Sequence, residues 1–260
     1  WANAFVDLQD ALAIARAGCV DTVKVAQGTY YPSDTVFVFD KCTSVLTNTI
    51  LPDKNISFNI PDSAVLLGGY GHGADSLTRD WECNKTVLCG DIDRNGILDL
   101  GNSIHVVTTI NVDSATIVDG FCITMGNASE SYQVYPDFVG GGWFDDGSGD
   151  DNGSFPTIIN CNISGNRANG GGGLFCDGRF GGNSSPKLIN CILSGNLGFA
   201  NGGAVFSDAN TGTSSPQLIN CVVAGNLAYY FDGAAMYNSG VNGGVCVPNI
   251  INTIFWNNRA

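Results

Sequence analysis

A run of oxygen-bearing side chains in the N-terminal half has the spacing of a calcium-binding loop. The candidate ligands stand at loop positions 1, 3, 5 and 9 and are Asp91, Asp93, Asn95 and Asp99. Gly96 occupies position 6, where the chain of such a loop must turn sharply. Position 12 is Asn102 instead of a bidentate glutamate, and the flanking residues do not have helical patterns. The residues therefore predict either a Ca²⁺ site or an acidic turn without an ion.

Carboxylates recur farther along the chain. Asp177 and Asp208 are the best pair for acid–base catalysis, because a glycoside hydrolase needs two carboxyl groups facing one groove. They occupy nearly equivalent places in successive repeats, about 5 Å apart if the repeats stack as strands. Two solvated corner residues would give the same pattern, and we favour that interpretation. His72 and His105 have no serine or cysteine partner in a recognisable motif, so we predict no catalytic residue.

Ten cysteines are present, and three of them recur at one position of a repeat: Cys161, Cys191 and Cys221. We expect these three to form a column of buried free thiols, because parallel side chains are poorly oriented for disulfide bonds. Cys83 and Cys89 are close in sequence within a predicted loop and form a candidate disulfide, and Cys19 and Cys42 are a weaker candidate pair. No Cys-x-x-Cys motif occurs, so nothing supports a zinc site or a thioredoxin-like site.

Two short sequence motifs, the first and the second phrase, alternate through the C-terminal half. They contain the recurring cysteines and the pair Asp177 and Asp208. The first reads PTIINCNISGN, PKLINCILSGN, PQLINCVVAGN and PNIINTIFWNN, and begins at Pro156, Pro186, Pro216 and Pro248. The second reads GGGWFDDG, GGGLFCDG, GGAVFSD and GAAMYNS, and begins at Gly140, Gly171, Gly202 and Gly233. The first phrase recurs after 30, 30 and 32 residues and the second after 31 each time. One shared period predicts a stacked repeat.

Each phrase is a short apolar run bounded by turn-forming residues. Each repeat, which contains one copy of both phrases, is therefore predicted to form one rung of a parallel solenoid with strands about 4.8 Å apart. Alternation places Ile189, Cys191 and Leu193 on one inward side of a strand. The same positions in the other copies hold Ile159, Cys161 and Ile163, then Ile219, Cys221 and Val223, then Ile251, Thr253 and Phe255. Leu188 is also apolar, so a bent rung that turns both sets inward is the alternative.

Asparagine recurs at two further positions of the repeat. One column comprises Asn160, Asn190, Asn220 and Asn252, and the other comprises Asn166, Asn196, Asn226 and Asn258. Equivalent residues of a solenoid lie above one another, and stacked amides donate and accept hydrogen bonds along the column. We therefore predict two structural ladders at the corners of the rungs, with ligand binding as the less favoured alternative.

The whole chain of 260 residues is predicted to be a single domain, an all-β right-handed parallel β-helix with a short N-terminal capping helix. Residues 1–20 form the cap, because Leu8, Ala11, Leu12 and Ala15 share one helical face. Residues 21–139 form irregular rungs with long loops, and residues 140–260 form regular rungs of about 31 residues.

Charge limits the classes of function. The net charge is −13, and charged residues make up only 13 % of the chain. Nucleic-acid binders carry a basic footprint, so the acidic charge argues against a nucleic-acid partner and none is expected. The longest apolar runs fall short of a membrane-spanning helix, so no membrane span is expected. An acidic, glycine-rich and asparagine-rich composition suits a corner-rich repeat protein that lives outside the cell.

The chain resembles secreted bacterial right-handed parallel β-helix proteins with repeats like those of polymorphic outer-membrane proteins. Their Gly-Gly-Ala-Ile and Phe-x-x-Asn phrases correspond here to Gly202-Gly203-Ala204-Val205 and Phe255-Trp256-Asn257-Asn258. The segments WANAFVDLQDALAIARAG, VKVAQGTYYP, LLGGYG and RDWECNKTVLCGDID are similar to the same group. The resemblance covers nearly the whole chain and is specific for fold. It implies secretion or display on the cell surface, but no particular activity.

From these observations we expect a non-catalytic structural or adhesive protein that self-assembles into an extracellular fibre or layer. Its expected partners are further copies of itself or surface glycans, and it requires no cofactor, with Ca²⁺ as the one candidate. The alternative is a carbohydrate-binding protein or a polysaccharide lyase or glycoside hydrolase. Candidate sugar-stacking aromatics for that alternative are Trp143, Tyr229, Tyr230 and Trp256.

Overall fold

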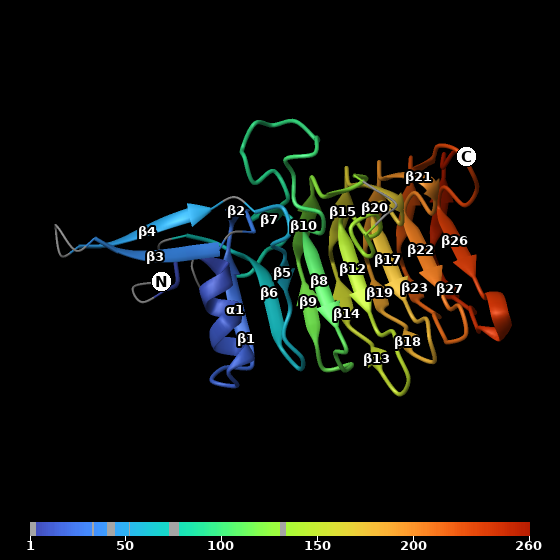
Figure 1. The fold of residues 1–260 in the computed structure, drawn as a ribbon, viewed down its shortest axis with the longest axis horizontal. Helices are drawn as coiled ribbons and strands as arrows, with labels where there is room; N and C mark the ends of the chain where they lie inside the picture. Colours follow the sequence, from blue (N-terminus) through green and yellow to red (C-terminus); the bar gives the residue numbers. More distant parts are fainter. Residues whose placement is uncertain (1–3, 33, 41–44, 52, 73–77, 131–133) are drawn as a thin grey trace.

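A computed structural model describes residues 4–32, 34–40, 45–51, 53–72, 78–130 and 134–260, with the backbone alone for 34–40 and 45–51. The chain folds as a parallel β-helix whose rungs stack along one long axis (Figure 1). The N-terminal helix lies at one end of the stack and the last strands lie at the other. The predicted fold class, with its short N-terminal helix, is confirmed.

Two seven-stranded sheets run the length of the stack, and every neighbouring pair in them is parallel. The first sheet contains, in order, β1 (Thr22–Ala26), β6 (Val65–Tyr70), β9 (Ile117–Asp119), β14 (Thr157–Ile159), β19 (Lys187–Ile189), β23 (Gln217–Ile219) and β27 (Asn249–Ile251). The second contains β2 (Gly28–Tyr30), β7 (Thr86–Cys89), β10 (Phe121–Thr124), β15 (Asn162–Ser164), β20 (Ile192–Ser194), β24 (Val222–Ala224) and β28 (Ile254–Trp256).

Two further parallel sheets close the rungs. The third sheet contains β11 (Asn127–Ala128), β16 (Arg167–Gly170), β21 (Leu197–Asn201) and β25 (Leu227–Ala228). The fourth contains β5 (Phe58–Asn59), β8 (Val107–Ile110), β12 (Trp143–Asp146), β17 (Leu174–Asp177), β22 (Val205–Asp208) and β26 (Met236–Ser239), and it faces the viewer in Figure 1. A short pair, β13 (Gly153–Ser154) and β18 (Asn183–Ser184), and a 3₁₀ turn at Val241–Gly243 lie at the corner that follows it.

The prediction of which residues face inward in the first phrase (PKLINCILSGN and its copies) is partly wrong. Leu188, Cys191 and Leu193 are buried, whereas Ile189 is only half-buried. The reason is Asn190, whose φ of +55° turns the chain between β19 and β20 so that the alternation starts again after it. Ile159 and Ile219 are likewise half-buried, because each also precedes a positive-φ asparagine. In the last rung Ile250, Ile251 and Phe255 are all exposed, because β27 and β28 are the last strands of their sheets. The rung therefore bends at the asparagine, but it does not turn both sets inward, because Leu188 is buried while Ile189 is only half-buried.

The capping helix α1 (Leu8–Arg16) forms as predicted. Asp7 is its N-cap and accepts a hydrogen bond from the backbone N–H of Gln9 at 2.9 Å, which satisfies one free donor of the first turn. Its buried residues are Leu8, Ala11, Leu12 and Ala15, and they join the same hydrophobic core as the strands. The helix therefore covers the apolar interior at this end of the solenoid.

An antiparallel hairpin departs from the rungs near the helix. It consists of β3 (Asp34–Asp40) and β4 (Val45–Leu51). It extends away from the stack beside α1 in Figure 1. Within the part of the chain that the structure describes, no helix is long and apolar enough to cross a membrane.

Candidate functional site

The fourth sheet sorts its side chains into two inner and two outer columns, because successive residues of a strand point to opposite faces. The strands β8, β12, β17, β22 and β26 pair without a register shift. One inner column is Val107, Trp143, Leu174, Val205 and Met236, and the other is Thr109, Asp145, Cys176, Ser207 and Asn238. The outer columns are Thr108, Phe144, Phe175, Phe206 and Tyr237, and Ile110, Asp146, Asp177, Asp208 and Ser239.

The outer aromatic column is continuous over four rungs. Ring centroids lie 6.0 Å apart between Phe144 and Phe175, 5.0 Å between Phe175 and Phe206, and 4.9 Å between Phe206 and Tyr237. These separations fall within the range for favourable aromatic pairs. Repetition of the second phrase, which has the pattern GGxxF in three of its four copies and has tyrosine at the same place in the fourth, thus builds a strip of aromatic side chains along the solenoid.

A loop covers the first half of this strip. Tyr135 packs edge-on to Phe144 and to Phe138, and His105 stacks on Phe144 at 5.0 Å. Phe144 and Phe175 are consequently only 3 % and 2 % exposed. Burial also lowers the pKa of His105 to about 4, so the ring is neutral at physiological pH.

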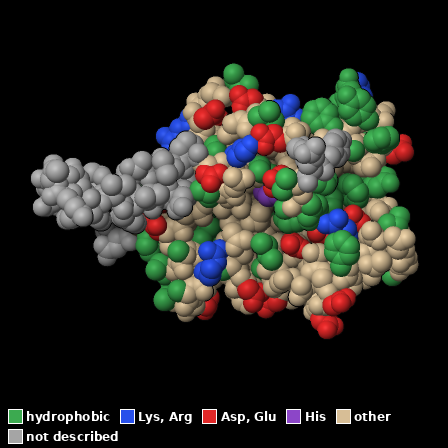
Figure 2. Space-filling view, viewed as in Figure 1, with side chains coloured by type: hydrophobic (Ala, Val, Ile, Leu, Met, Phe, Trp, Pro, Cys, Tyr) green, Lys and Arg blue, Asp and Glu red, His purple; other side chains and the backbone are tan. Residues whose placement is uncertain are grey.

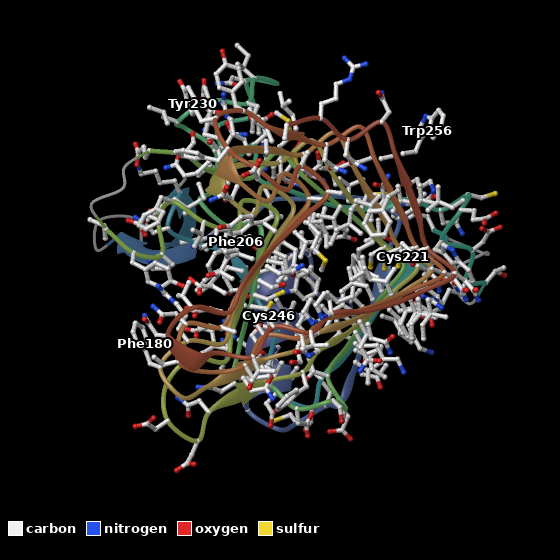
Figure 3. All side chains as sticks on the ribbon, turned by 90° about the vertical axis from the view of Figure 1, so that its right-hand side faces the viewer. Phe180, Phe206, Cys221, Tyr230, Cys246 and Trp256 are labelled. Carbon is white, nitrogen blue, oxygen red and sulfur yellow. The ribbon has the colours of Figure 1, made fainter. Side chains whose placement is uncertain are left out.

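The second half of the strip is open. Phe206 and Tyr237 are half-buried, and the corner before β26 adds Tyr229, Tyr230 and Phe231, which are 60–68 % exposed. Figure 2 shows hydrophobic side chains gathered over the C-terminal half of this face. Seen down the axis, Phe180, Phe206 and Tyr230 lie on one side of the solenoid (Figure 3). Large exposed apolar patches are where soluble proteins bind other molecules, so this surface is a candidate binding surface.

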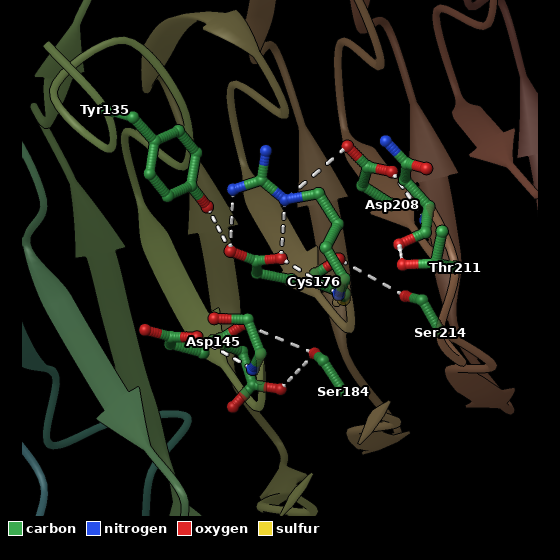
Figure 4. A network of polar contacts seen from close by, with 12 residues as sticks. Tyr135, Asp145, Cys176, Ser184, Asp208, Thr211 and Ser214 are labelled. Atoms are coloured by element: carbon green, nitrogen blue, oxygen red, sulfur yellow. Dashed lines mark hydrogen bonds and ion pairs between the residues drawn. The ribbon is translucent and has the colours of Figure 1, made fainter. Parts of the chain in front are cut away.

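A polar network borders the aromatic strip (Figure 4). Asp177 pairs with Arg179 through two hydrogen bonds, at 2.9 Å from Nε and 3.0 Å from Nη2, and it also accepts one from the hydroxyl of Tyr135. The Arg179 guanidinium lies over the Tyr135 ring at 4.0 Å, and its Nε is 3.9 Å from Asp208. Burial, together with the negative charge of Asp177, raises the pKa of Tyr135, so this phenol stays protonated.

The carboxylate pair predicted from the repeats therefore exists, but not as two solvated residues. Asp177 and Asp208 are register partners in β17 and β22, and Asp177 is fully buried on the outer side, under Tyr135 and Arg179. Burial raises the pKa of Asp208 and also that of Asp146, which is the register partner of Asp177 in β12. Because Arg179 and Tyr135 occupy the oxygens of Asp177, this carboxylate is bound within the protein and not available as a base.

Asp145 is enclosed by the rungs. It is fully buried and accepts hydrogen bonds of 2.6 Å from the hydroxyls of Thr109, Ser154 and Ser184. Burial raises its pKa to about 6, although the three hydroxyls oppose the shift. Asp145 and Asp146 are adjacent in β12, and the alternation of the strand places them on opposite faces of the sheet.

The candidate calcium loop folds around its own hydrogen bonds. Asp91 accepts from the backbone N–H of Asn95 and Gly96 at 3.1 and 2.9 Å. The Asn95 amide nitrogen donates to Asp93 at 2.9 Å and to Asp99 at 3.1 Å. Across the described ranges, no group of three or more His, Cys, Asp or Glu side chains is arranged to hold a metal. The structure thus brings Asp93, Asn95 and Asp99 together, while the calcium ion stays a prediction.

The predicted ladders behave differently from one another. The column that ends at Asn258 is a continuous amide ladder, in which Asn166, Asn196 and Asn226 are 1 % exposed and each Nδ2 donates to the next Oδ1 at 2.9–3.1 Å. The column that begins at Asn160 lies at the positive-φ corner and has a single longer contact of 3.4 Å, from Asn190 to Asn160.

The cysteine column is buried and free, as expected, but the candidate disulfide is absent. Cys161, Cys191 and Cys221 are 1–2 % exposed, and each Sγ contacts backbone carbonyl oxygens at 3.2–3.6 Å. Burial raises the pKa of Cys161 to about 12. Cys83 and Cys89 are both free thiols, because Cys89 is buried at the end of β7 while Cys83 is exposed in the preceding turn. Cys42 lies outside the described residues.

Sequence reasoning missed most of the open aromatic strip. An aromatic residue follows the glycines of each GGxxF phrase, so the signal for the column was present in the repeat. Nothing in the repeat indicated Tyr135 or Arg179. Of the named candidates, Tyr229, Tyr230 and Trp256 are exposed, whereas Trp143 is fully buried, with its indole N–H bound to Thr109 at 2.8 Å.

No protein-family model matches this chain, and no curated protein or solved structure is significantly similar to it. Its function therefore has to be argued from the fold and from these sites.

Proposed function

We propose that this protein is a secreted or cell-surface β-helix that adheres to glycans through the outer face of the fourth sheet and catalyses no reaction. The observation that carries the proposal is the open part of the aromatic strip, formed by Phe206 and Tyr237 with the corner aromatics Tyr229 to Phe231. Aromatic rings offer flat apolar surface at low entropic cost, which suits the apolar face of a sugar ring.

The polar groups beside the strip support the same function. Arg179 and Asp208 border Phe206, and both side chains are 17 % exposed. Ligand sites combine aromatic surface with a few placed polar groups that fix orientation. Arg179 is also held by Asp177, so its remaining N–H groups are presented from a fixed position. The open surface extends over two neighbouring rungs and the corner before β26, and this elongated shape favours a chain-like glycan over a single compact ligand.

Non-catalytic binding is favoured over hydrolysis for one structural reason. Of the outer carboxylates, Asp177 is buried and bound by Arg179 and Tyr135, so the register pair Asp177 and Asp208 lacks a free base. A hydrolase would need both carboxyl groups to reach the bond being cleaved. The resemblance of the chain to secreted surface proteins supports the extracellular setting.

The test is binding to a glycan array and to insoluble polysaccharides, with a matched pair of aromatic truncations. Phe206→Ala combined with Tyr230→Ala should remove binding, because both rings belong to the open strip. Trp256→Ala, which truncates a ring that is 72 % exposed on the opposite side, should bind as the wild type does. Equal binding by all variants would overturn the proposal. Ordered fibres in electron micrographs without glycan binding would instead support the self-assembling structural role.

Turnover of the bound polysaccharides should be measured in the same samples. We expect no release of reducing or unsaturated sugar. Release that disappears in Asp208→Asn would replace adhesion with catalysis and restore the carbohydrate-active alternative.

A further inference from the structure

A cavity of about 330 Å³ lies on another side of the solenoid. It lies between the segment 81–85 and the corner that joins the first and second sheets. Its aromatic and polar lining residues are Trp81, Glu82, Lys85, Asn160, Asn162 and Asn190. Cys221, which follows the same corner in the next rung, lies opposite Phe206 in Figure 3. The cavity is therefore separate from the aromatic strip of the fourth sheet.

Trp81 forms a fixed wall of this cavity. The Arg79 guanidinium lies over its ring at 5.1 Å and is held in turn by Asp119 at 2.7 Å. A Cβ atom at Gly69 or Gly120 would come within 2.9 Å of Trp81, so the segment packs directly on the backbone of two rungs. Trp81 as a whole residue is nevertheless 36 % exposed. A large ring that is fixed in place and still exposed offers preorganised apolar contact to a ligand.

The opposite wall supplies amides. Asn160 donates to Asp119 at 2.9 Å and lies 3.4 Å from the Asn190 amide nitrogen, which fixes two amides at adjacent rungs. Asn162 lines the cavity beside these two amides, with its Oδ1 atom turned into the protein and buried. Lys85 and Glu82 are exposed at the rim and add a donor and an acceptor of opposite charge.

We propose that this cavity binds one neutral sugar residue. The apolar face of the sugar ring packs on Trp81, and its hydroxyl groups exchange hydrogen bonds with the corner amides, Lys85 and Glu82. The volume lies at the small end of the range for ligand sites, which suits a single ring. A lining that mixes donors and acceptors, with one positive and one negative side chain at the rim, matches a hydroxylated ligand better than an anion. This site is independent of the proposed adhesion surface.

The test is a titration of the purified full chain with neutral hexoses, followed by tryptophan fluorescence and calorimetry. Glucuronate serves as an anionic comparison. We expect saturable binding of a neutral hexose, about tenfold weaker in Lys85→Met and in Trp81→Phe. The fluorescence change should vanish in Trp81→Phe and persist in Trp256→Phe. Thermal unfolding of each variant checks that it is folded, and Lys85→Met keeps the test valid if Trp81→Phe does not fold, since Lys85 is exposed.

Separate outcomes distinguish this site from the adhesion surface. Hexose binding that survives Phe206→Ala with Tyr230→Ala supports the cavity, whatever the array result is. Absence of saturable hexose binding overturns the cavity proposal and leaves the adhesion proposal intact. Tighter binding of glucuronate than of every hexose would also overturn it, because the assigned ligand is neutral. Equal affinity of wild type and Lys85→Met would place the bound sugar elsewhere.

Discussion

Two columns of asparagine run through the same rungs six residues apart, yet their surroundings differ. Asn196 is 1 % exposed, and its amide exchanges hydrogen bonds with Asn166, Asn226 and the carbonyl of Ile163. Asn190 is exposed, and its φ of +55° places it in the left-handed region. The enclosed column is selected for its side-chain amide, whereas the corner column is selected for its backbone conformation. Identical residues at identical spacing therefore have two separate physical causes.

The largest effect should come from breaking the enclosed ladder. Asn196→Ala leaves the Asn166 N–H and the Ile163 carbonyl without their side-chain partner in a site that water does not reach. Each stranded buried group costs about 1–3 kcal/mol, so we expect a loss of about 4 kcal/mol in the free energy of unfolding. Urea denaturation followed by circular dichroism measures it. A loss below that of Asn190→Ala, the same substitution at the corner, would contradict the distinction.

An enclosed carboxylate should give the next effect, and it should depend on pH. The folded pKa of Asp145 is about 6, above the ordinary aspartate value of 3.8. Between these values the folded state binds more protons than the unfolded chain, so stability falls as pH rises from about 4 through 6, by about 3 kcal/mol in total. Asp145→Asn should remove this part of the pH profile.

The pH experiment needs a difference measurement, because burial also raises the pKa values of Asp146 and Asp208. Unfolding of wild type and Asp145→Asn at each pH isolates the contribution of Asp145. The exposed Asp151→Asn is the matched control and should follow the wild-type profile. A stability that rises through this window in wild type relative to Asp145→Asn would show that the enclosed carboxylate is ionised at low pH.

The candidate calcium loop, residues 91–99, is a polar cluster whose stability can be tested for dependence on an ion. One Asn95 amide bridges Asp93 and Asp99, whose negative charges repel each other. We expect Ca²⁺ at 100 times its dissociation constant to stabilise the protein by about 2.7 kcal/mol. Calorimetric melts with Ca²⁺ and with EDTA measure this shift.

Asp99→Asn should lose the calcium shift and keep the fold. The matched control is Asp232→Asn, an exposed carboxylate in a regular rung, which should keep the shift. If neither the wild type nor the control responds to Ca²⁺, the loop is an acidic turn held by its own hydrogen bonds.

The fold could be predicted because a period of about 31 residues is a property of the chain itself, and rungs of equal length have to stack. The helix cap could be predicted for a similar reason, since Asp7 and the face from Leu8 to Ala15 are local. The polar network could not, because Tyr135 reaches Asp177 across 42 residues from a loop outside the repeat. The direction of Ile189 was also missed, since it depends on the backbone angle of one neighbouring asparagine.

The smallest effect isolates that backbone angle. At φ near +55°, a residue with a Cβ but without the asparagine side chain is strained by about 1 kcal/mol, so Asn190→Ala should lose about that much stability. Asn190→Gly should be nearly neutral. Glycine adopts this φ without the strain that alanine suffers, and its greater entropy in the unfolded chain cancels only part of that advantage over alanine. Denaturation of both variants beside Asn196→Gly provides the comparison. At the corner, glycine should rescue what alanine loses. In the enclosed ladder glycine should be at least as damaging as alanine, because there the amide, and not the angle, stabilises the rung.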